Sequence, residues 1–291
     1  MKYSVSSYSF SQYLKDGKLT TFSCIQKAKE LGFDAIEFVE LSAPEGKTLS
    51  DFANELASEA ARVGIEISNY AVGADFIRGS DGDIEKEISR VCAQVDIARI
   101  LGCPVMRHDV TGGKTYHKFE GYNNVLERLA YGCRRVTEYA ASVGVRTMTE
   151  NHGYFSQDSL RVEKLINTVA HDNFGWLIDI GNFLCADDEP AAAVGRAARY
   201  AFYVHAKDFI VKSGQQANPG RGFFMSRGGN FLRGTIIGHG DVPVMQCLYA
   251  LKRAGYDGFI TIEFEGMEDC IDGVSIGLDN LKRYVSQVYG E

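Results

Sequence analysis

The sequence predicts an α/β protein that folds as a single (β/α)8 TIM barrel over residues 1–291, with a long loop excursion after the seventh strand. Three observations predict this fold. The chain has 291 residues, of which 45% are hydrophobic and 24% are charged, so one large core can form. Eight short runs of apolar and β-branched residues recur along the chain, and amphipathic segments of helical periodicity lie between them. Barrels of this kind commonly use about 250 residues as one domain, which fits this length.

Five of the expected strands follow a glycine at a helix-to-strand joint. In each case an amphipathic segment ends in an apolar residue and a glycine, and glycine suits the left-handed backbone position that closes a helix. An apolar or β-branched run begins within a few residues. These strands are expected at residues 35–38, 66–68, 104–106, 146–149 and 259–262, after Gly32, Gly64, Gly102, Gly144 and Gly255.

The other three expected strands lack such a glycine but are apolar runs that end at a polar residue, at 3–6, 174–178 and 201–204. Helical patterns, with apolar residues three and four apart, lie between the strands; the clearest span 52–63, 84–101, 125–143 and 245–254. Strands and helices that alternate eight times favour parallel strands joined by helical crossovers. A closed barrel is the expected arrangement.

An open, doubly wound sheet is the alternative arrangement of alternating strands and helices. Its dinucleotide-binding members carry a glycine-rich phosphate loop after the first strand. Here the residues at 7–10 read SYSF, and the chain contains neither that fingerprint nor a P-loop. The barrel is therefore favoured.

Composition excludes several classes of protein. The formal net charge is −7 and the lysines and arginines are scattered, so we expect no nucleic-acid partner. The seven cysteines show no regular spacing, which argues against disulfides and a cysteine-bound zinc. The sequence has no cationic leader and no apolar run of about 18 residues. We expect a cytoplasmic protein with no membrane partner.

Four successive strands, from the fifth to the eighth, end in side chains that can bind metals. In a barrel of this type the carboxyl ends of the strands meet at one mouth, where catalytic groups lie. Three carboxylates and one imidazole suit a hard divalent ion, and buried carboxylates side by side would repel each other without a cation. We expect one ion, with Mn(II) as first choice and Mg(II), Co(II) or Zn(II) as alternatives, held by Glu150, Asp179, His205 and Glu263.

The motifs around these residues resemble those of the xylose-isomerase-like (β/α)8 superfamily of sugar phosphate isomerases and epimerases. That superfamily also contains ketose 3-epimerases, inosose dehydratases and endonuclease IV. The resemblance covers nearly the whole chain and is strongest in TENHG at 149–153, IDIGN at 178–182, VHAKD at 204–208, GHGDVP at 238–243 and GYDGFITIEFE at 255–265. It implies the same four metal ligands. It also implies that Glu150 and Glu263 are catalytic and exchange protons with carbon atoms next to a carbonyl.

Four further residues are candidates for substrate binding. His108 ends the fourth strand and is expected to reach the same mouth. Asn182 lies where some ketose epimerases of the superfamily have a substrate-binding histidine. Lys207, like Asp208 beside it, follows a ligand residue and could orient the ligands or form a surface salt bridge, and His239 lies in a loop motif.

The expected function is a metal-dependent isomerase or epimerase that acts on a keto-sugar or related polyol by proton transfer through an enediolate. A lyase on the same site is the alternative, either an inosose-type dehydratase or an enzyme that splits keto-glycosides by β-elimination. An endonuclease IV-like phosphodiesterase and a non-catalytic sugar-binding subunit are further alternatives. The endonuclease is disfavoured because the chain has only six histidines and an acidic charge balance.

The excursion at 209–240 contains many glycines and a group of apolar residues that an isolated loop could not bury: Phe223, Phe224, Met225, Phe231 and Leu232. Long loops in compact domains are usually functional, and exposed apolar clusters usually mark an interface. We therefore expect this segment to pack over the mouth of its own barrel or against a second subunit in a homo-oligomer.

Overall fold

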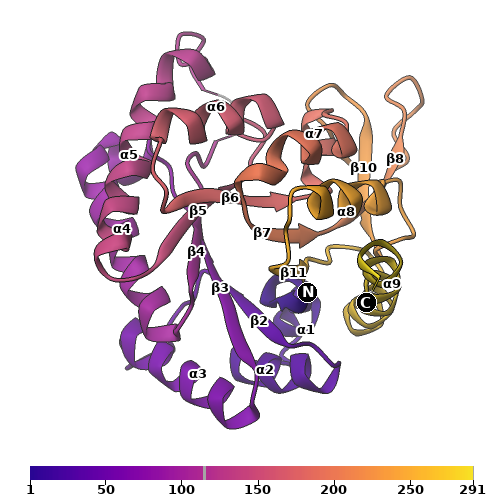
Figure 1. Cartoon of the computed structure of the whole chain (residues 1–291), viewed down its shortest axis with the longest axis horizontal. Coiled ribbons are helices and arrows are strands. Elements are labelled where there is room, and N and C mark those ends of the chain that lie inside the picture. The colour runs from indigo at the N-terminus through magenta and orange to yellow at the C-terminus, as the bar shows by residue number, and fades with distance from the viewer. Residues whose placement is uncertain (114–115, 291) are drawn as a thin grey trace.

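Eight parallel strands close into a barrel, and the helices surround it (Figure 1). The computed structural model describes residues 1–113 and 116–290. The strand order around the barrel is β1-β11-β7-β6-β5-β4-β3-β2, so sequence neighbours are also spatial neighbours. The predicted barrel is confirmed, with strands β1 (Lys2–Ser6), β2 (Ala35–Val39), β3 (Glu66–Val72), β4 (Val105–His108), β5 (Arg146–Glu150), β6 (Phe174–Asp179), β7 (Ala201–Ala206) and β11 (Phe259–Ile262).

The helices begin and end near the residues that the sequence indicates. Gly64 and Gly102 close two of them in the left-handed conformation, with φ of 73° and 76°, as expected at helix-to-strand joints. None of the helices in the described ranges is long and apolar enough to cross a membrane. The α-helices of the described residues are α1 (Ser11–Lys15), α2 (Thr21–Glu30), α3 (Leu49–Val63), α4 (Ile84–Leu101), α5 (Tyr122–Ser142), α6 (Ser159–Val169), α7 (Pro190–Ala197), α8 (Val244–Arg253) and α9 (Cys270–Tyr289).

The interior of the barrel is packed, so the mouth has a closed floor. Val105, Met148, Leu177 and Tyr203 form one buried cluster there. The Tyr203 hydroxyl contacts the hydroxyls of Ser68 and Thr261 at 2.6 Å each, so the polar groups among these apolar residues are paired. Because side chains two residues apart share a face of a strand, Tyr203 lies directly below the residue at position 205.

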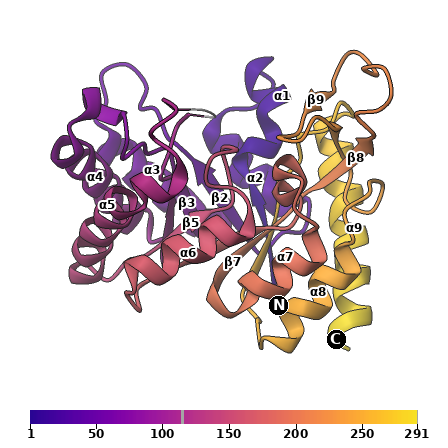
Figure 2. The same cartoon turned by 90° about the horizontal axis from the view of Figure 1, so that it is seen from above.

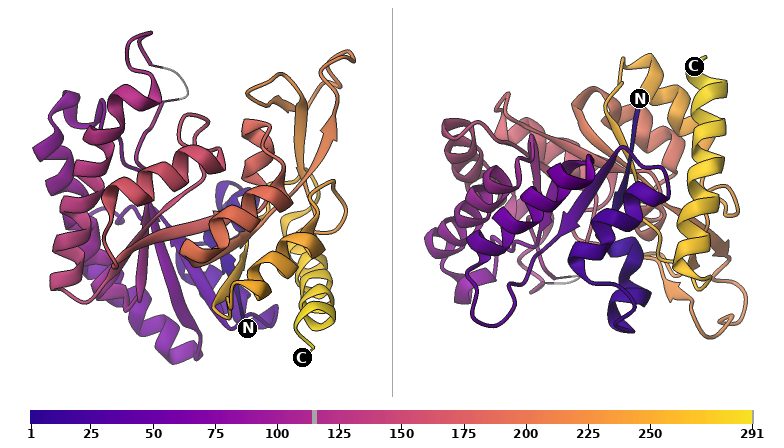
Figure 3. Two further views of the ribbon diagram at one scale, coloured as in Figure 1. Left: turned by 45° about the horizontal axis from the view of Figure 1, so that its top comes forward. Right: turned by 90° about the horizontal axis from the view of Figure 1, so that it is seen from below.

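The excursion is more ordered than expected, because it contains a small antiparallel sheet. Strands β8 (Asp208–Lys212), β10 (Phe231–Thr235) and β9 (Phe224–Met225) pair in that order. The two longer strands are about 20 residues apart in sequence, so no local pattern indicates their pairing. In Figures 2 and 3 this sheet lies at one end of the molecule, away from the two chain termini.

The excursion packs against its own barrel, which is one of the two arrangements expected from the sequence. Phe209 and Leu232 form a buried cluster with Cys185, which lies in the short 3-10 helix η3 (Asn182–Ala186) after β6. Arg227 strengthens the contact, since its backbone amide donates to the Cys185 carbonyl at 2.8 Å. A contact between subunits of a homo-oligomer stays a prediction.

Asp208 ties the two ends of the excursion together. Its buried carboxylate accepts hydrogen bonds from the backbone amides of Phe209 at 2.9 Å, Gly238 at 2.8 Å, Gly240 at 3.0 Å and Val242 at 3.1 Å. The sequence left open a ligand-orienting role or a surface salt bridge for Asp208. In the structure Asp208 instead accepts hydrogen bonds from the backbone of the loop that returns to the barrel, and so holds that loop in place.

Replacing Asp208 with alanine should lower the free energy of unfolding by about 3 kcal/mol, because four backbone donors lose their shared acceptor. Asp241→Ala is the matched control: this exposed residue accepts one bond, from the Val211 amide at 2.7 Å, and its loss should cost under about 1 kcal/mol. Urea unfolding of both variants measures the difference. Equal losses would contradict the assigned role.

Candidate metal centre

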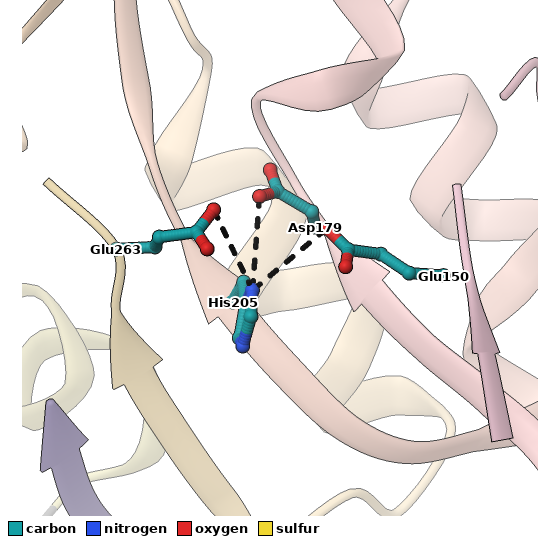
Figure 4. A group of neighbouring side chains, drawn as sticks. All are labelled: Glu150, Asp179, His205 and Glu263. Atoms are coloured by element: carbon teal, nitrogen blue, oxygen red, sulfur yellow. Dashed lines mark ion pairs between the residues drawn. The ribbon is translucent and has the colours of Figure 1, made fainter. Parts of the chain in front are cut away.

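The structure brings Glu150, Asp179, His205 and Glu263 together at the carboxyl ends of four adjacent strands. Each offers one ligand atom, and these atoms lie within 4.8 Å of one another. Nδ1 of His205 is 3.8 Å from Glu150 Oε1, 3.9 Å from Asp179 Oδ2 and 3.8 Å from Glu263 Oε2. Figure 4 shows the glutamates approaching from opposite sides, with Asp179 between them and His205 below. The four strand ends therefore converge on one point.

Two buried atoms at this point have no hydrogen-bond partner within the described residues: His205 Nδ1 and Asp179 Oδ2. Orphaned buried polar atoms are rare in folded proteins and require an explanation. The other imidazole nitrogen, Nε2, is 2.8 Å from Glu37 Oε2, so it carries the proton and leaves the Nδ1 lone pair free. Three oxygens and one nitrogen fit a divalent ion such as Mn(II), Mg(II), Co(II) or Zn(II).

The electrostatics keep the two glutamates ionised. Burial opposes charge on Glu150, but the neighbouring Arg107 guanidinium outweighs it and lowers its pKa below the ordinary value. The pKa of Glu263 is likewise lowered, because the Lys207 ammonium outweighs burial. For Asp179, burial dominates and raises the pKa to about 6, with Glu150 adding to the effect.

Glu37 is a site residue that sequence reasoning missed. It lies on β2, is fully buried, and contacts both His205 Nε2 and the Asn69 side-chain amide, each at 2.8 Å. The sequence offered one signal for this residue: Glu37 is an acidic residue inside the otherwise apolar run at 35–38. Its partner could not be identified from sequence, because only closure of the barrel brings β2 across from β7.

Arg107 and Asn182 hold the Glu150 carboxylate from two sides. The Arg107 guanidinium contacts Glu150 Oε2 at 2.6 Å and also pairs with Asp109 at 3.1 Å. The Asn182 amide donates to Glu150 Oε1 at 3.0 Å. Asn182 thus lies at the centre as expected, and Arg107 lies against the same ligand residue.

Lys207 lies inside the site and forms no surface salt bridge. Its ammonium is 2.5 Å from Glu263 Oε2, 3.4 Å from Asp179 Oδ2 and 3.2 Å from the Asn182 side-chain oxygen. Burial disfavours its charge, but Glu263 and the neighbouring carboxylates hold its pKa well above the ordinary value. Lys207 therefore acts as a fixed positive charge among the ligand residues.

The structure does not bring His108 to the mouth, contrary to expectation. Its ring lies between Phe76 and Phe174 on the helix side of the barrel, and burial lowers its pKa to about 4. Alternate residues of a strand point to opposite faces, so the inward position on β4 belongs to Arg107. His239 is also outside the centre: it is exposed in the loop after β10 and does not line the cavity described next.

A cavity of about 250 Å³ opens above the four residues. This is the volume of about eight water molecules, enough for a small polar ligand. Its walls include Tyr8, Arg107, Lys207, His152 and Glu265. His152 reaches it from the turn after β5, held by a 3.0 Å contact with Asp109. Charged side chains make up much of the lining.

Among curated proteins the chain is similar to an inosose dehydratase of Lacticaseibacillus casei. The two are 25% identical over 142 residues, which is 48% of this chain and 47% of the relative. The chain thus spans about half the length of that relative.

Solved structures share the fold. One is an L-ribulose 3-epimerase, 16% identical with a TM-score of 0.75, in an alignment that covers 99% of this chain and 95% of that one. Another is an IolI protein with a bound zinc atom, 15% identical with a TM-score of 0.76 and 100% coverage of both chains. At these identities the likeness establishes the architecture alone.

A family model described as xylose isomerase-like TIM barrel matches residues 25–284. This range includes every barrel strand except β1, together with all four candidate ligand residues. It agrees with the closed eight-stranded barrel and with the resemblance of the sequence motifs. The chain belongs to the xylose isomerase-like TIM barrel family.

Proposed function

We propose that this protein is a metal-dependent isomerase or epimerase that transfers protons on a keto-sugar or related polyol. The observation that carries this proposal is the placement of Glu150 and Glu263 at the two ends of the ligand cluster, each against a cationic side chain. Two ionised carboxylates on opposite sides of a substrate can remove a proton from one face and return it to another.

Glu150, Asp179, His205 and Glu263 would hold the ion, which we take to be Mn(II), with Mg(II), Co(II) or Zn(II) as alternatives. When bound, such an ion polarises a carbonyl and stabilises the negative charge that develops beside it. The donor set, the orphaned atoms and the likeness to a zinc-bound structure support this assignment.

The remaining side chains have distinct roles in the proposal. Lys207 keeps Glu263 ionised, so that this carboxylate can accept a proton from carbon. Arg107 and Asn182 fix the orientation of Glu150. Lys207 and Asn182 also bind substrate hydroxyl groups. Return of the proton to the opposite face of the same carbon gives an epimer, and return to the neighbouring carbon gives an isomer.

A lyase is the second candidate, favoured by the similarity to an inosose dehydratase. It begins with the same removal of a proton next to a carbonyl, after which a hydroxyl or a glycosidic oxygen leaves from the next carbon. The leaving oxygen needs a proton donor at the cavity wall. His152, half exposed and paired with Asp109, is suitably placed for this role.

The metal assignment predicts that the purified protein binds one divalent ion and that Asp179→Asn weakens Mn(II) binding at least about 100-fold, because one anionic ligand is lost. Isothermal titration calorimetry after treatment with a chelator measures both. Asp188→Asn, a change outside the cluster, is the control and should leave the affinity unchanged. Full Mn(II) affinity in Asp179→Asn would contradict the ligand set.

Glu37→Gln should weaken Mn(II) binding by about 10- to 100-fold, since the amide no longer fixes the His205 tautomer or raises the basicity of the ring. Glu40→Gln, at a residue that directly follows β2 and lines the cavity but does not contact His205, is the matched control. Calorimetry on the two variants separates them. If both bind Mn(II) as the wild type does, Glu37 has no part in holding His205.

Glu150→Gln and Glu263→Gln should each lower turnover at least about 100-fold, while His171→Ala, at the opposite end of β6 from the centre, should change it little. The assay is a panel of keto-sugars, inososes and keto-glycosides in deuterium oxide with Mn(II), read by mass and NMR. Deuterium next to a carbonyl identifies proton transfer, and loss of water or of the aglycone identifies the lyase. Near-normal deuterium exchange in both Gln variants would contradict the scheme in which two carboxylates transfer the proton.

A further inference from the structure

A second cavity, of about 720 Å³, lies beyond the candidate metal centre and differs from it in chemistry. Among the described residues its walls include six apolar or aromatic side chains that come from the segment before α5, the first residue of α5, the turn after β5 and strand β9 of the excursion. They are Tyr116, Tyr122, Tyr154, Phe155, Phe224 and Met225. Two pairs of these rings pack together: Tyr116 and Phe155 edge to face with centroids 4.6 Å apart, and Tyr122 and Phe155 tilted with centroids 5.7 Å apart.

A third hollow of about 370 Å³ lies between the two cavities and shares wall residues with each. Lys207 and Glu265 line both this hollow and the cavity above the ligand residues. Tyr154 and Phe224 line both this hollow and the aromatic cavity. A molecule bound at the candidate metal centre can therefore extend along the shared walls to the aromatic rings.

Tyr154 at this junction has a left-handed backbone, with φ of 64°, which residues other than glycine rarely adopt. Its neighbours hold it there: its amide donates to the Gln157 side chain at 2.5 Å, and its hydroxyl donates to the Met225 carbonyl at 2.8 Å. Disfavoured backbone of this kind clusters at ligand-binding sites. Here it places an aromatic ring between the two cavities.

Two polar groups on the aromatic walls are already engaged. The Tyr122 hydroxyl donates to the Arg161 carbonyl at 2.6 Å, and the Glu120 carboxylate contacts Arg78 at 3.1 Å. Among the described wall residues, apolar surface exceeds polar surface, which favours a ring over a second sugar. The guanidinium of Arg161 lies over the rings of Tyr122 and Phe155, at 5.3 and 5.6 Å, and adds positive charge at the edge.

We propose that this cavity binds an aryl group linked to the sugar, so that the substrate class is an aryl glycoside whose sugar ring carries a keto group. The proposal rests on the proposed function, because it takes the sugar part to lie at the candidate metal centre. Ring stacking holds the aryl group, and the cationic edge accommodates phenolic oxygens.

Calorimetric titration of the full chain, with Mn(II) present, tests the aryl site with phenyl β-glucoside and methyl β-glucoside as probes. The phenyl compound should bind at least about tenfold more tightly. Phe224→Ala should abolish this difference. Phe223→Ala, which removes the adjacent ring that lies under Arg233 and outside the cavity, should preserve it. Unchanged Mn(II) affinity shows that each variant remains folded.

Saturation-transfer NMR on the wild-type protein gives a readout that requires no variant. Irradiation of protein methyl resonances, where the probe has no signal, should saturate the phenyl protons of the probe more strongly than its sugar protons. Equal affinity for the two glucosides, a phenyl preference that survives Phe224→Ala, or equal saturation of phenyl and sugar protons would each overturn the proposal.

The two proposals can fail separately. Binding of phenyl glucoside and free phenol that depends on Phe224, with no deuterium exchange into any sugar, refutes the proposed function and supports the aryl site. Deuterium exchange into sugars with no phenyl preference refutes the aryl site alone.

Discussion

The arrangement of this molecule depends on one constraint: closure of the barrel gathers several carboxylates in a buried mouth. Glu150 and Asp179 are almost completely buried, and Glu263 lies beside them. Like charges at such short range repel strongly where water is excluded. Two permanently charged cations, Arg107 and Lys207, offset part of this repulsion from opposite ends of the cluster. Carboxylates still outnumber these cations around the cavity, which is the condition under which a divalent ion binds well.

A layer of hydrogen bonds behind the ligand residues keeps them in position. Asn151 is the clearest case: its side chain donates to the Asp179 carbonyl at 2.8 Å and accepts from the Asp179 amide at 3.0 Å and from Trp176 Nε1 at 3.1 Å. It thereby joins the ends of β5 and β6 without touching the centre itself. Glu37 likewise holds His205 in position, through its contact with Nε2 from across the barrel. Such a fixed surrounding is what allows a site to act on a substrate without reorganising.

The two kinds of cavity follow from two kinds of chain segment. The strand ends supply the charged mouth, because inward-pointing residues at or next to the ends of the strands face one another. The turn after β5 and the excursion supply the aromatic walls, since these segments must bury apolar side chains against the barrel rim. Phe209 and Leu232 anchor the excursion on η3, and Asp208 closes its base. Loops held this firmly can present a binding surface of fixed shape.

The sequence by itself determined the barrel, its strands and its main helices, because hydrophobic periodicity and the glycines at the joints are local signals. It also determined that Glu150, Asp179, His205 and Glu263 share one mouth, since a strand end has a known place in such a barrel. Only the tertiary structure decided what depends on contacts between distant strands and on the facing of single residues. The pairing of Glu37 with His205 needs closure across the barrel. The inward position of Arg107 in place of His108 depends on the register of a short strand, where a shift by one residue exchanges the two faces. The pairing of β8 with β10, and the aromatic cavity beside it, join segments whose separation in the chain leaves no local pattern.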